Sequence, residues 1–403
     1  MSTGSKKGEP IRVGFILEVQ DWLGGINYYR SLLSALSLLP EPGILPIRFA
    51  GSSAPESLTG NFDCVEIIRS KVLETTSPAG IARRLARKIF RQRDIVLDGL
   101  LRRHRINVLS HYSGALAPGT PIKTIGWIPD FQYLHLPELF TGADLMMRKS
   151  AVARLTDHCD RVILSSEAAR QDLARVEPRA LDKSRVLHFV PQVDAGKPTS
   201  PVSELEKRYG FQGPYFYLPN QFWAHKNHRL VIDALAHLKR RGISVTVLST
   251  GNTRDHRFPE HFNDLMARVR ISGLEECFRV LGVVPYGDLL SLMRHSLAVI
   301  NPSLCEGWST TVEEAKALDK AVLLSDIAVH REQKPAKGIF FDPRNADELA
   351  EKMESLSEAR ESPAYSSDGM TYASSYKDGR MAFASGYQSI VKELCEARRP
   401  RPD

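Results

Sequence analysis

Short apolar runs alternate along the chain with longer stretches in which apolar residues recur every three or four positions. The short runs are typical of buried strands, and the longer stretches are typical of helices that pack on a sheet. Strands are expected at 11–17, 45–50, 108–111, 124–128 and 161–165, and again at 215–218, 244–249, 278–281, 298–300, 321–325 and 339–341. Helices are expected at 31–39, 146–155, 228–240, 286–294, 312–318 and 380–396. This alternation predicts an α/β fold with parallel sheets.

A break in the pattern divides the chain, whose 403 residues are too many for one ordinary core. Residues 190–203 are rich in Pro, Gly and Ser and have no periodicity, so the domain boundary is expected there. We predict doubly wound domains over 1–195 and 196–378, followed by a final segment over 379–403. Two such domains predict a cleft between them, with ligands bound beyond the carboxyl ends of the strands.

The composition narrows the class of protein. No window approaches the roughly 20 apolar residues that span a bilayer. The polar N-terminus has no apolar signal core, so we expect a cytoplasmic protein. The five cysteines are scattered without a C-x-x-C pair, which favours free thiols over a zinc site or a disulfide framework.

The net charge of +7 is concentrated in one basic stretch. Nine Arg and Lys residues lie from Arg83 to Arg105, opposed only by Asp94 and Asp98. Apolar residues are interspersed at roughly helical spacing, so the stretch is either a solvated helix face or a basic amphipathic helix on anionic lipid headgroups. The second alternative adds a peripheral location on the inner face of the membrane. No nucleic-acid-binding motif accompanies the charge, and nucleic acid is not an expected partner.

The densest candidate chemistry follows the strand expected at 298–300. A glycine, Gly307, and three small hydroxyl residues lead into the helix expected at 312–318; the hydroxyl residues are Ser309, Thr310 and Thr311. The N-terminus of a helix presents unpaired N–H groups and partial positive charge, which suits a diphosphate. Glycine lets a ligand approach the backbone closely.

Two carboxylates flank this predicted helix end. Glu306 lies on the loop, and Glu314 lies eight residues later, about one turn into the helix. One carboxylate suits sugar hydroxyls and the other suits a ribose. The alternative is that Ser309 or Thr310 only caps the helix and that both glutamates are solvated.

The segment from Glu306 to Glu314 resembles the E-x7-E signature of the glycosyl transferases group 1 family, which are retaining nucleotide-sugar glycosyltransferases with the GT-B fold. Other segments resemble the family in the same order and together cover most of residues 11–345. They are the glycine pair Gly24-Gly25, the strand and helix start over 160–173, the loop Gln221 to Asn227, and the turn Leu281-Gly282-Val283.

The resemblance implies two Rossmann-like domains facing a cleft, with a C-terminal helix that crosses back to the N-domain. It implies that Glu306 contacts the donor hexose, Glu314 the ribose, and Lys226 the leaving phosphate, whose charge it neutralises. The implied catalytic residues are Glu306, Lys226 and Asp130. The implied donor-binding residues are Gly24, Gly25, Asn220, Gln221, Lys226, Val283, Glu306, Gly307, Trp308, Ser309, Thr310, Thr311 and Glu314.

Two positions depart from the family pattern. Gln221 stands where relatives often have an Arg five residues before the Lys, which places more of the phosphate clamping on Lys226 and the helix end. Pro129 replaces a His that many relatives have before Asp130, and His135 is not assumed to substitute for it. A subset of polysaccharide-building relatives resembles this chain in the sequence of the segments 129–132 and 222–228. We therefore interpret the two departures as features of a subfamily.

The resemblance implies metal-independent transfer of a hexose from a nucleotide-diphosphate sugar to a glycan or lipid-linked acceptor, in surface polysaccharide assembly. No cofactor or metal is expected, because the chain has no Asp-x-Asp and no carboxylate or cysteine stands at ligand spacing from His225 and His228. Two alternatives stay open. One is an inactive transferase-like module that binds a glycan or nucleotide, and the other is a GT-B nucleotide-sugar epimerase.

Overall fold

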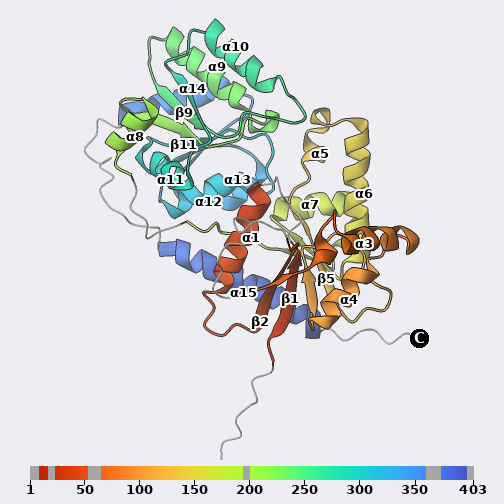
Figure 1. Ribbon diagram of the computed structural model, residues 1–403. Coiled ribbons are helices and arrows are strands. Elements are labelled where there is room, and N and C mark those ends of the chain that lie inside the picture. Colours follow the sequence, from red (N-terminus) through yellow and green to blue (C-terminus); the bar gives the residue numbers. More distant parts are fainter. Residues whose placement is uncertain (1–8, 17–22, 53–64, 194–199, 360–373, 397–403) are drawn as a thin grey trace, which may run out of the picture. The chain divides into compact units, whose positions relative to one another are not determined.

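The computed structural model describes residues 9–16, 23–52, 65–193, 200–359 and 374–396. These residues form two compact units, each built on one sheet (Figure 1). Unit 1 holds the described residues of 1–131, 144–192 and 377–403, and unit 2 holds those of 132–143 and 193–376. The sequence placed 132–143 in the N-terminal domain, whereas the structure packs this segment with unit 2. The domain limits predicted at 195 and 378 stay predictions.

Unit 1 carries a seven-stranded parallel sheet in the order β3-β2-β1-β4-β5-β6-β7. Its strands are β1 (Ile11–Ile16), β2 (Ile44–Ala50), β3 (Glu66–Arg69), β4 (Val108–Ser110), β5 (Lys123–Ile128), β6 (Arg161–Leu164) and β7 (Ser184–Val186). The sequence missed β3 and β7. Both are short edge strands, and β3 alternates little because most of it is exposed.

Helices cover the sheet of unit 1 (Figure 1). They are α1 (Leu23–Leu36), α3 (Pro78–Ile89), α4 (Ile95–Arg103), α6 (Gly142–His158), α7 (Glu167–Val176) and α15 (Ser374–Glu396), with short 3-10 turns η1 (Lys71–Leu73) and η3 (Pro178–Ala180). Part of the core lies between β2 and α4, where Phe49, Leu97 and Leu101 are fully buried. Strands buried on both faces appear in the sequence as the continuous apolar runs from which they were predicted.

The C-terminal helix α15 belongs to unit 1 from residue 377 onward, which confirms the predicted return to the N-domain. The Tyr387 hydroxyl donates to Ser110 Oγ at 2.7 Å, at the end of β4. Arg380 Nη2 donates to Ser34 Oγ of α1 at 2.7 Å, so α15 and α1 lie side by side (Figure 1). The chain therefore completes its first unit with its last helix.

The basic stretch is not the single helix that the sequence suggested. It forms α3 and α4, separated by a turn in which Arg91 and Gln92 have φ values of 50° and 66°. Asp94 caps α4 by accepting from the Leu97 amide at 3.1 Å. Left-handed backbone cannot continue a helix, which accounts for the break.

Unit 2 carries a six-stranded parallel sheet in the order β10-β9-β8-β11-β12-β13. Its strands are β8 (Tyr215–Leu218), β9 (Thr246–Thr250), β10 (Phe278–Gly282), β11 (Val299–Asn301), β12 (Val322–Ser325) and β13 (Gly338–Phe341). Its helices are α5 (Gln132–His135), α8 (Val202–Tyr209), α9 (His228–Arg240), α10 (His261–Ile271), α11 (Tyr286–His295), α12 (Thr310–Ala317), α13 (Ala328–Gln333) and α14 (Ala346–Ala359), with short 3-10 turns η2 (Pro137–Leu139) and η4 (Ala224–Lys226).

The order of unit 2 reverses between β8 and β11, which are hydrogen-bonded neighbours. In a doubly wound sheet, the loops that leave two such strands diverge to opposite faces and open a crevice at their carboxyl ends. The loops over 219–227 and 302–309 follow these two strands. Both stretches that the sequence singled out in the second half of the chain therefore lie at the topological switch point.

Candidate active site

Asn227 joins the two loops at the switch point of unit 2. Its Nδ2 donates to the carbonyl oxygens of Pro302, at 3.1 Å, and of Pro343, at 2.9 Å. The Leu304 amide also donates to the His225 carbonyl at 2.9 Å. Asn227 has a φ of 57°, a left-handed conformation that Asn adopts more readily than most side chains. Asn227 thus changes the chain direction between the first loop and α9, and it also holds the first loop against the second loop.

The loops bring Lys226 and Glu306 together as a buried ion pair. Lys226 Nζ donates to Glu306 Oε1 at 2.6 Å, and the side chains are only 16% and 9% exposed. Burial alone would raise the pKa of Glu306, but the charge and hydrogen bond of Lys226 lower it to about 2. Glu306 is therefore ionised throughout the physiological range.

Ser309 caps α12, as the alternative interpretation of this segment expected. Its Oγ accepts from the Val312 amide at 3.4 Å and from Asn301 Nδ2 at 2.6 Å. Its own amide donates to Gln333 Oε1 at 3.3 Å. The helix end that remains open is that of Thr310 and Thr311, whose amides have no intrahelical acceptor by position. The other part of that alternative is wrong, because neither glutamate is solvated.

Glu314 lies on α12 with only 6% of its surface exposed. Burial raises its pKa to about 7, although the Tyr286 hydroxyl, which donates to Oε1 at 2.8 Å, opposes the shift. Tyr286 begins α11, three residues after the exposed Val283. The hydrogen bond therefore links α12 to the turn that follows β10. Glu314 is poised between its two protonation states near neutral pH.

A buried amide and hydroxyl network lies beneath these groups. Ser303 Oγ donates to Asn301 Oδ1 at 2.8 Å, and Asn220 Nδ2 approaches the same oxygen at 3.5 Å. Thr311 Oγ1 donates to Asn220 Oδ1 at 3.5 Å. A Cβ at Gly251, whose φ is 147°, would overlap the carbonyl of Asn220, so only glycine fits there. Satisfied buried networks of this kind restrict side chains to one arrangement.

Arg257 is a site residue that the sequence analysis missed. Its Nη1 donates to Gln132 Oε1 at 3.1 Å, and its Nη2 lies 3.5 Å from His225 Nδ1. The guanidinium also lies 5.0 Å from the centre of the Phe140 ring. Asp255, 3.7 Å from Arg257, accepts from the Ala224 amide and so joins this cation to the Lys226 loop. The signal available in the sequence was the position of Arg257 in the loop after the strand expected at 244–249.

Three of the expected site residues belong to unit 1. Asp130 is half-buried and follows β5. Gly24 and Gly25 lie in the first turn of α1, and residues 17–22 before that turn fall outside the described part of the chain. Pro129 is also half-buried in unit 1. In unit 2, Gln221, Gly307 and Thr310 are half-buried, and Trp308 is buried at 9% exposure.

A groove of about 920 Å³ lies in unit 2, lined by neighbours of the ion pair in sequence but not by the pair itself. Asn227 and Leu304 line it, together with Asp326 and Asp342, which follow β12 and β13. It therefore opens at the carboxyl edge of the sheet, where ligands of such folds bind. Among the residues that the structure describes, no three His, Cys, Asp or Glu side chains gather so that they could hold a metal ion.

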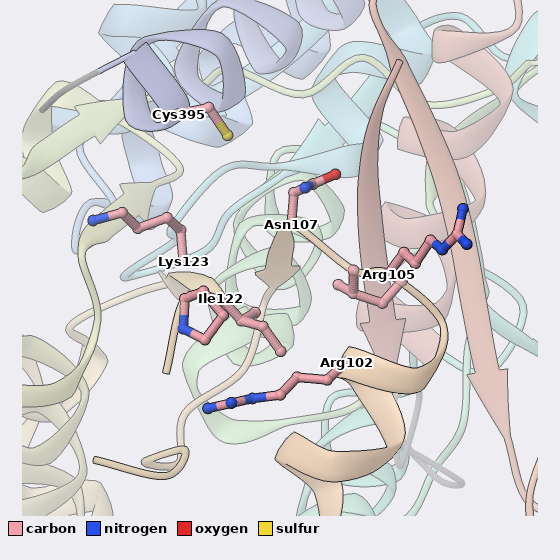
Figure 2. A pocket seen from close by; sticks show the side chains of 8 residues that line it. Arg102, Arg105, Asn107, Ile122, Lys123 and Cys395 are labelled. Carbon is pink, nitrogen blue, oxygen red and sulfur yellow. The ribbon is translucent and has the colours of Figure 1, made fainter. Parts of the chain in front are cut away.

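Unit 1 has a second hollow, of about 460 Å³, shown in Figure 2. Its lining includes Arg102, Arg105, Lys123 and the thiol of Cys395. Asn107 and Lys123 precede or begin β4 and β5, so the hollow lies at the amino ends of the strands. This is the edge opposite to the one that carries ligands in parallel α/β sheets. We therefore place the site in unit 2.

Comparison with known proteins agrees with this fold. Residues 206–368 match the family model described as Glycosyl transferases group 1, a range that includes the ion pair and α12. A search of curated proteins gave no match.

In structure, the chain is similar to a glycosyltransferase from Rickettsia africae, with a TM-score of 0.68 and 16% identity over 96% of this chain and 100% of that one. It is also similar to the Anabaena protein HepE in complex with UDP and glucose, with a TM-score of 0.66 and 17% identity over 95% and 99% of the two chains. A sucrose-phosphate synthase from Thermosynechococcus elongatus gives a TM-score of 0.63 and 13% identity over 95% and 94%. These likenesses confirm the predicted two-sheet GT-B fold.

The buried pair predicts a non-additive stability cycle. Lys226→Met should lower the free energy of unfolding by about 3–5 kcal/mol, because it leaves the Glu306 carboxylate buried without a partner. Adding Glu306→Gln should recover most of that loss, since the uncompensated charge is gone. The measurement is urea denaturation of the two single variants and the double variant. Lys337→Met is the control, because the pair of Lys337 with Asp319 is exposed and should contribute less than about 1 kcal/mol. Additive losses in the double variant would contradict the pairing.

Proposed function

We propose that this chain is a glycosyltransferase of the glycosyl transferases group 1 family, whose model matches residues 206–368, and that it transfers a hexose from a nucleotide-diphosphate sugar to a glycan or lipid-linked acceptor. The observation that carries the proposal is the buried Lys226–Glu306 pair at the switch point. Uridine diphosphate is the nucleotide we favour. The structurally similar HepE is described in complexes with UDP and glucose and with UDP-glucose.

The donor diphosphate is proposed to bind at the N-terminus of α12. The amides of Thr310 and Thr311 are the open donors there, and a helix N-terminus favours an anion. Lys226 supplies a full positive charge beside them. The ribose is assigned to Glu314 and the base to the backbone around Val283, because Tyr286 already connects that turn to Glu314.

The reaction breaks the bond between the anomeric carbon of the hexose and the β-phosphate oxygen, and the electron pair stays on the phosphate. Lys226 stabilises the charge that builds on this leaving group, which is the kind of preorganised electrostatic effect that contributes most to catalysis. Glu306 contacts the hexose hydroxyls and stabilises the positive charge that develops on the sugar ring. Its low pKa of about 2 keeps it anionic for this purpose.

Retention of the anomeric configuration is proposed from the family resemblance. In a front-face displacement, the departing phosphate oxygen takes the proton of the acceptor hydroxyl as the new glycosidic bond forms. A covalent route would need a nucleophilic carboxylate placed about 5 Å from an acid partner. For Asp130, Gly24 and Gly25, which belong to unit 1, a role at the reacting centre and at the diphosphate rests on the resemblance alone.

Arg257 is proposed to provide the positive charge that relatives with an Arg at the position of Gln221 have in addition to the lysine. It is anchored by Gln132 and Phe140 and reaches His225, the residue before Lys226. Burial lowers the pKa of His225 to about 3, with the charge of Lys226 adding to the effect, so this imidazole is neutral. A neutral His225 lets Lys226 and Arg257 act as separate cations on either side of it.

The acceptor and pathway are proposed to be those of surface polysaccharide or lipid-linked oligosaccharide assembly, at the inner face of a membrane. This part of the proposal rests on the resemblance of the 129–132 and 222–228 segments to polysaccharide-building relatives. Metal independence is part of it, because Lys226 and the end of α12 take the place of a divalent cation at the diphosphate.

The central prediction is donor turnover without metal. In EDTA, one of UDP-, GDP-, dTDP-, ADP- and CMP-sugars should raise the melting temperature and be hydrolysed slowly, with the UDP-sugar expected. Glu306→Gln and Lys226→Met should each lower this rate by about 100-fold or more. Lys337→Met, which removes an exposed lysine elsewhere in unit 2, should leave it unchanged.

The alternatives give different results in the same assay. Nucleotide binding without turnover would point to a binding module. An isomerised sugar nucleotide without hydrolysis or transfer would point to an epimerase. No nucleotide binding at millimolar concentration would overturn the proposal.

Nucleotide affinity should depend on the protonation of Glu314. A ribose diol donates hydrogen bonds to a carboxylate, so binding favours the ionised form of a group whose pKa burial has raised to about 7. The affinity for UDP should therefore fall about tenfold between pH 8 and pH 6, since at pH 6 most molecules must first lose a proton. The measurement is the affinity for UDP, by calorimetry at several pH values, of the wild type and of Glu314→Gln. Protonation of the UDP phosphate affects both proteins equally, so the difference between them reports on Glu314. Equal pH slopes in the two proteins would exclude the role.

Removing the Arg257 side chain should slow donor hydrolysis, and placing an arginine at position 221 instead should restore part of the rate. Arg257→Met is expected to lower kcat/KM for donor hydrolysis by about 10- to 100-fold. Gln221→Arg in the same variant should recover part of the loss, which a purely structural role would not allow. Arg254→Met, in the same loop but exposed, is the matched control. An unchanged rate in Arg257→Met, or no recovery with Gln221→Arg, would remove Arg257 from the proposed machinery.

A further inference from the structure

Helix α3 buries one charged side chain, Arg83, and exposes most of its apolar side chains. Its buried residues are Gly80 and Arg83. Ile81, Leu85 and Ile89, spaced four residues apart, are 42%, 56% and 74% exposed, and Phe90 after the helix is 47% exposed. Residues four apart share one face of a helix. These four side chains form an outward apolar ridge, named here the α3 ridge.

The orientation of α3 is fixed by contacts that allow no rotation. Arg83 Nε donates to Asp94 Oδ2 at 2.8 Å, and the two side chains are 8% and 0% exposed. Turning the α3 ridge inward would expose this pair and leave the buried Asp94 without its cation, which is costly. At the other end, Ser77 Oγ accepts from the Gly80 amide at 2.9 Å, and a Cβ at Gly80 would overlap the Glu74 carbonyl.

The charge around the α3 ridge has one sign. Residues 78–93 contain six Arg and Lys and no Asp or Glu. Arg84, Lys88 and Arg91 are exposed. An apolar stripe flanked by exposed basic side chains matches the interface of an anionic bilayer, where acyl chains lie beneath negative headgroups.

We propose that the α3 ridge docks unit 1 on an anionic lipid bilayer, with its apolar side chains below the headgroups and Arg84, Lys88 and Arg91 among them. A second copy of the chain is disfavoured as the occupant, because it would place the exposed Arg84, Lys88 and Arg91 against charges of the same sign. This inference rests on the proposed function, because docking would bring the enzyme to the membrane that carries a lipid-linked acceptor. Docking itself does not require the enzyme to be active. No helix in the described ranges is long and apolar enough to cross a bilayer.

The test is flotation of the full chain with vesicles of phosphatidylcholine, with and without phosphatidylglycerol. The wild type should float with the anionic vesicles only, and less at high salt. Arg84→Gln with Lys88→Gln should weaken the partitioning by about 30-fold, from a loss of about 1 kcal/mol for each basic residue. Leu85→Gln with Ile89→Gln should weaken it by at least about tenfold, because the ridge no longer inserts.

Matched controls lie in unit 2. Ile271→Gln removes an isolated apolar side chain that is 88% exposed, and Lys334→Gln with Arg344→Gln removes two exposed charges. Both should float like the wild type. Circular dichroism checks that each variant is folded, and donor hydrolysis should be unchanged in the α3 variants, so failure to dock is distinguishable from failure of the transferase.

Three outcomes would overturn the proposal. The first is equal failure of the wild type on both kinds of vesicle, and the second is normal flotation of the ridge variant. The third is a wild-type dimer in light scattering that Leu85→Gln with Ile89→Gln converts to a monomer, because a second copy would then be the occupant.

Discussion

The site depends on one buried ion pair. Lys226 and Glu306 lie on loops that leave neighbouring strands, β8 and β11, at the point where the strand order reverses. Each charge would be costly to bury alone, and each is stable there only because the other is 2.6 Å away. The pair therefore fixes the distance between the two loops. In the proposed reaction, a leaving phosphate at Lys226 would meet a cation that is already desolvated and held in place.

The surrounding structure serves that pair. Asn227 ties its loop to the carbonyl oxygens of Pro302 and Pro343, and Ser309 uses its side chain and amide to cap and anchor α12. The capping leaves the next two amides of α12 open for an anion. The two glutamates have different pKa values because their surroundings differ. The cation of Lys226 lowers the pKa of Glu306 to about 2, and burial raises the pKa of Glu314 to about 7.

The sequence predicts the layers of the fold and misses contacts between distant segments. Helix α9 and strand β8 are found with the predicted bounds because apolar periodicity and buried runs report local burial. The approach of Lys226 to Glu306 follows from the parallel sheet, since carboxyl ends share one edge. Arg257 could not be assigned, because its anchor Gln132 is 125 residues away and the 132–143 segment packs with the second unit. The orientation of α3 stayed open between a solvated face and a membrane-facing one, because periodicity finds an apolar face but does not say which way it points.

The most direct test of this account is a crystal structure with UDP-glucose or UDP bound. The account predicts that the β-phosphate lies within hydrogen-bond distance of Lys226 Nζ and of the amides of Thr310 and Thr311, with the ribose hydroxyls on Glu314. A nucleotide bound away from the end of α12, with the Lys226–Glu306 pair untouched by it, would contradict the account.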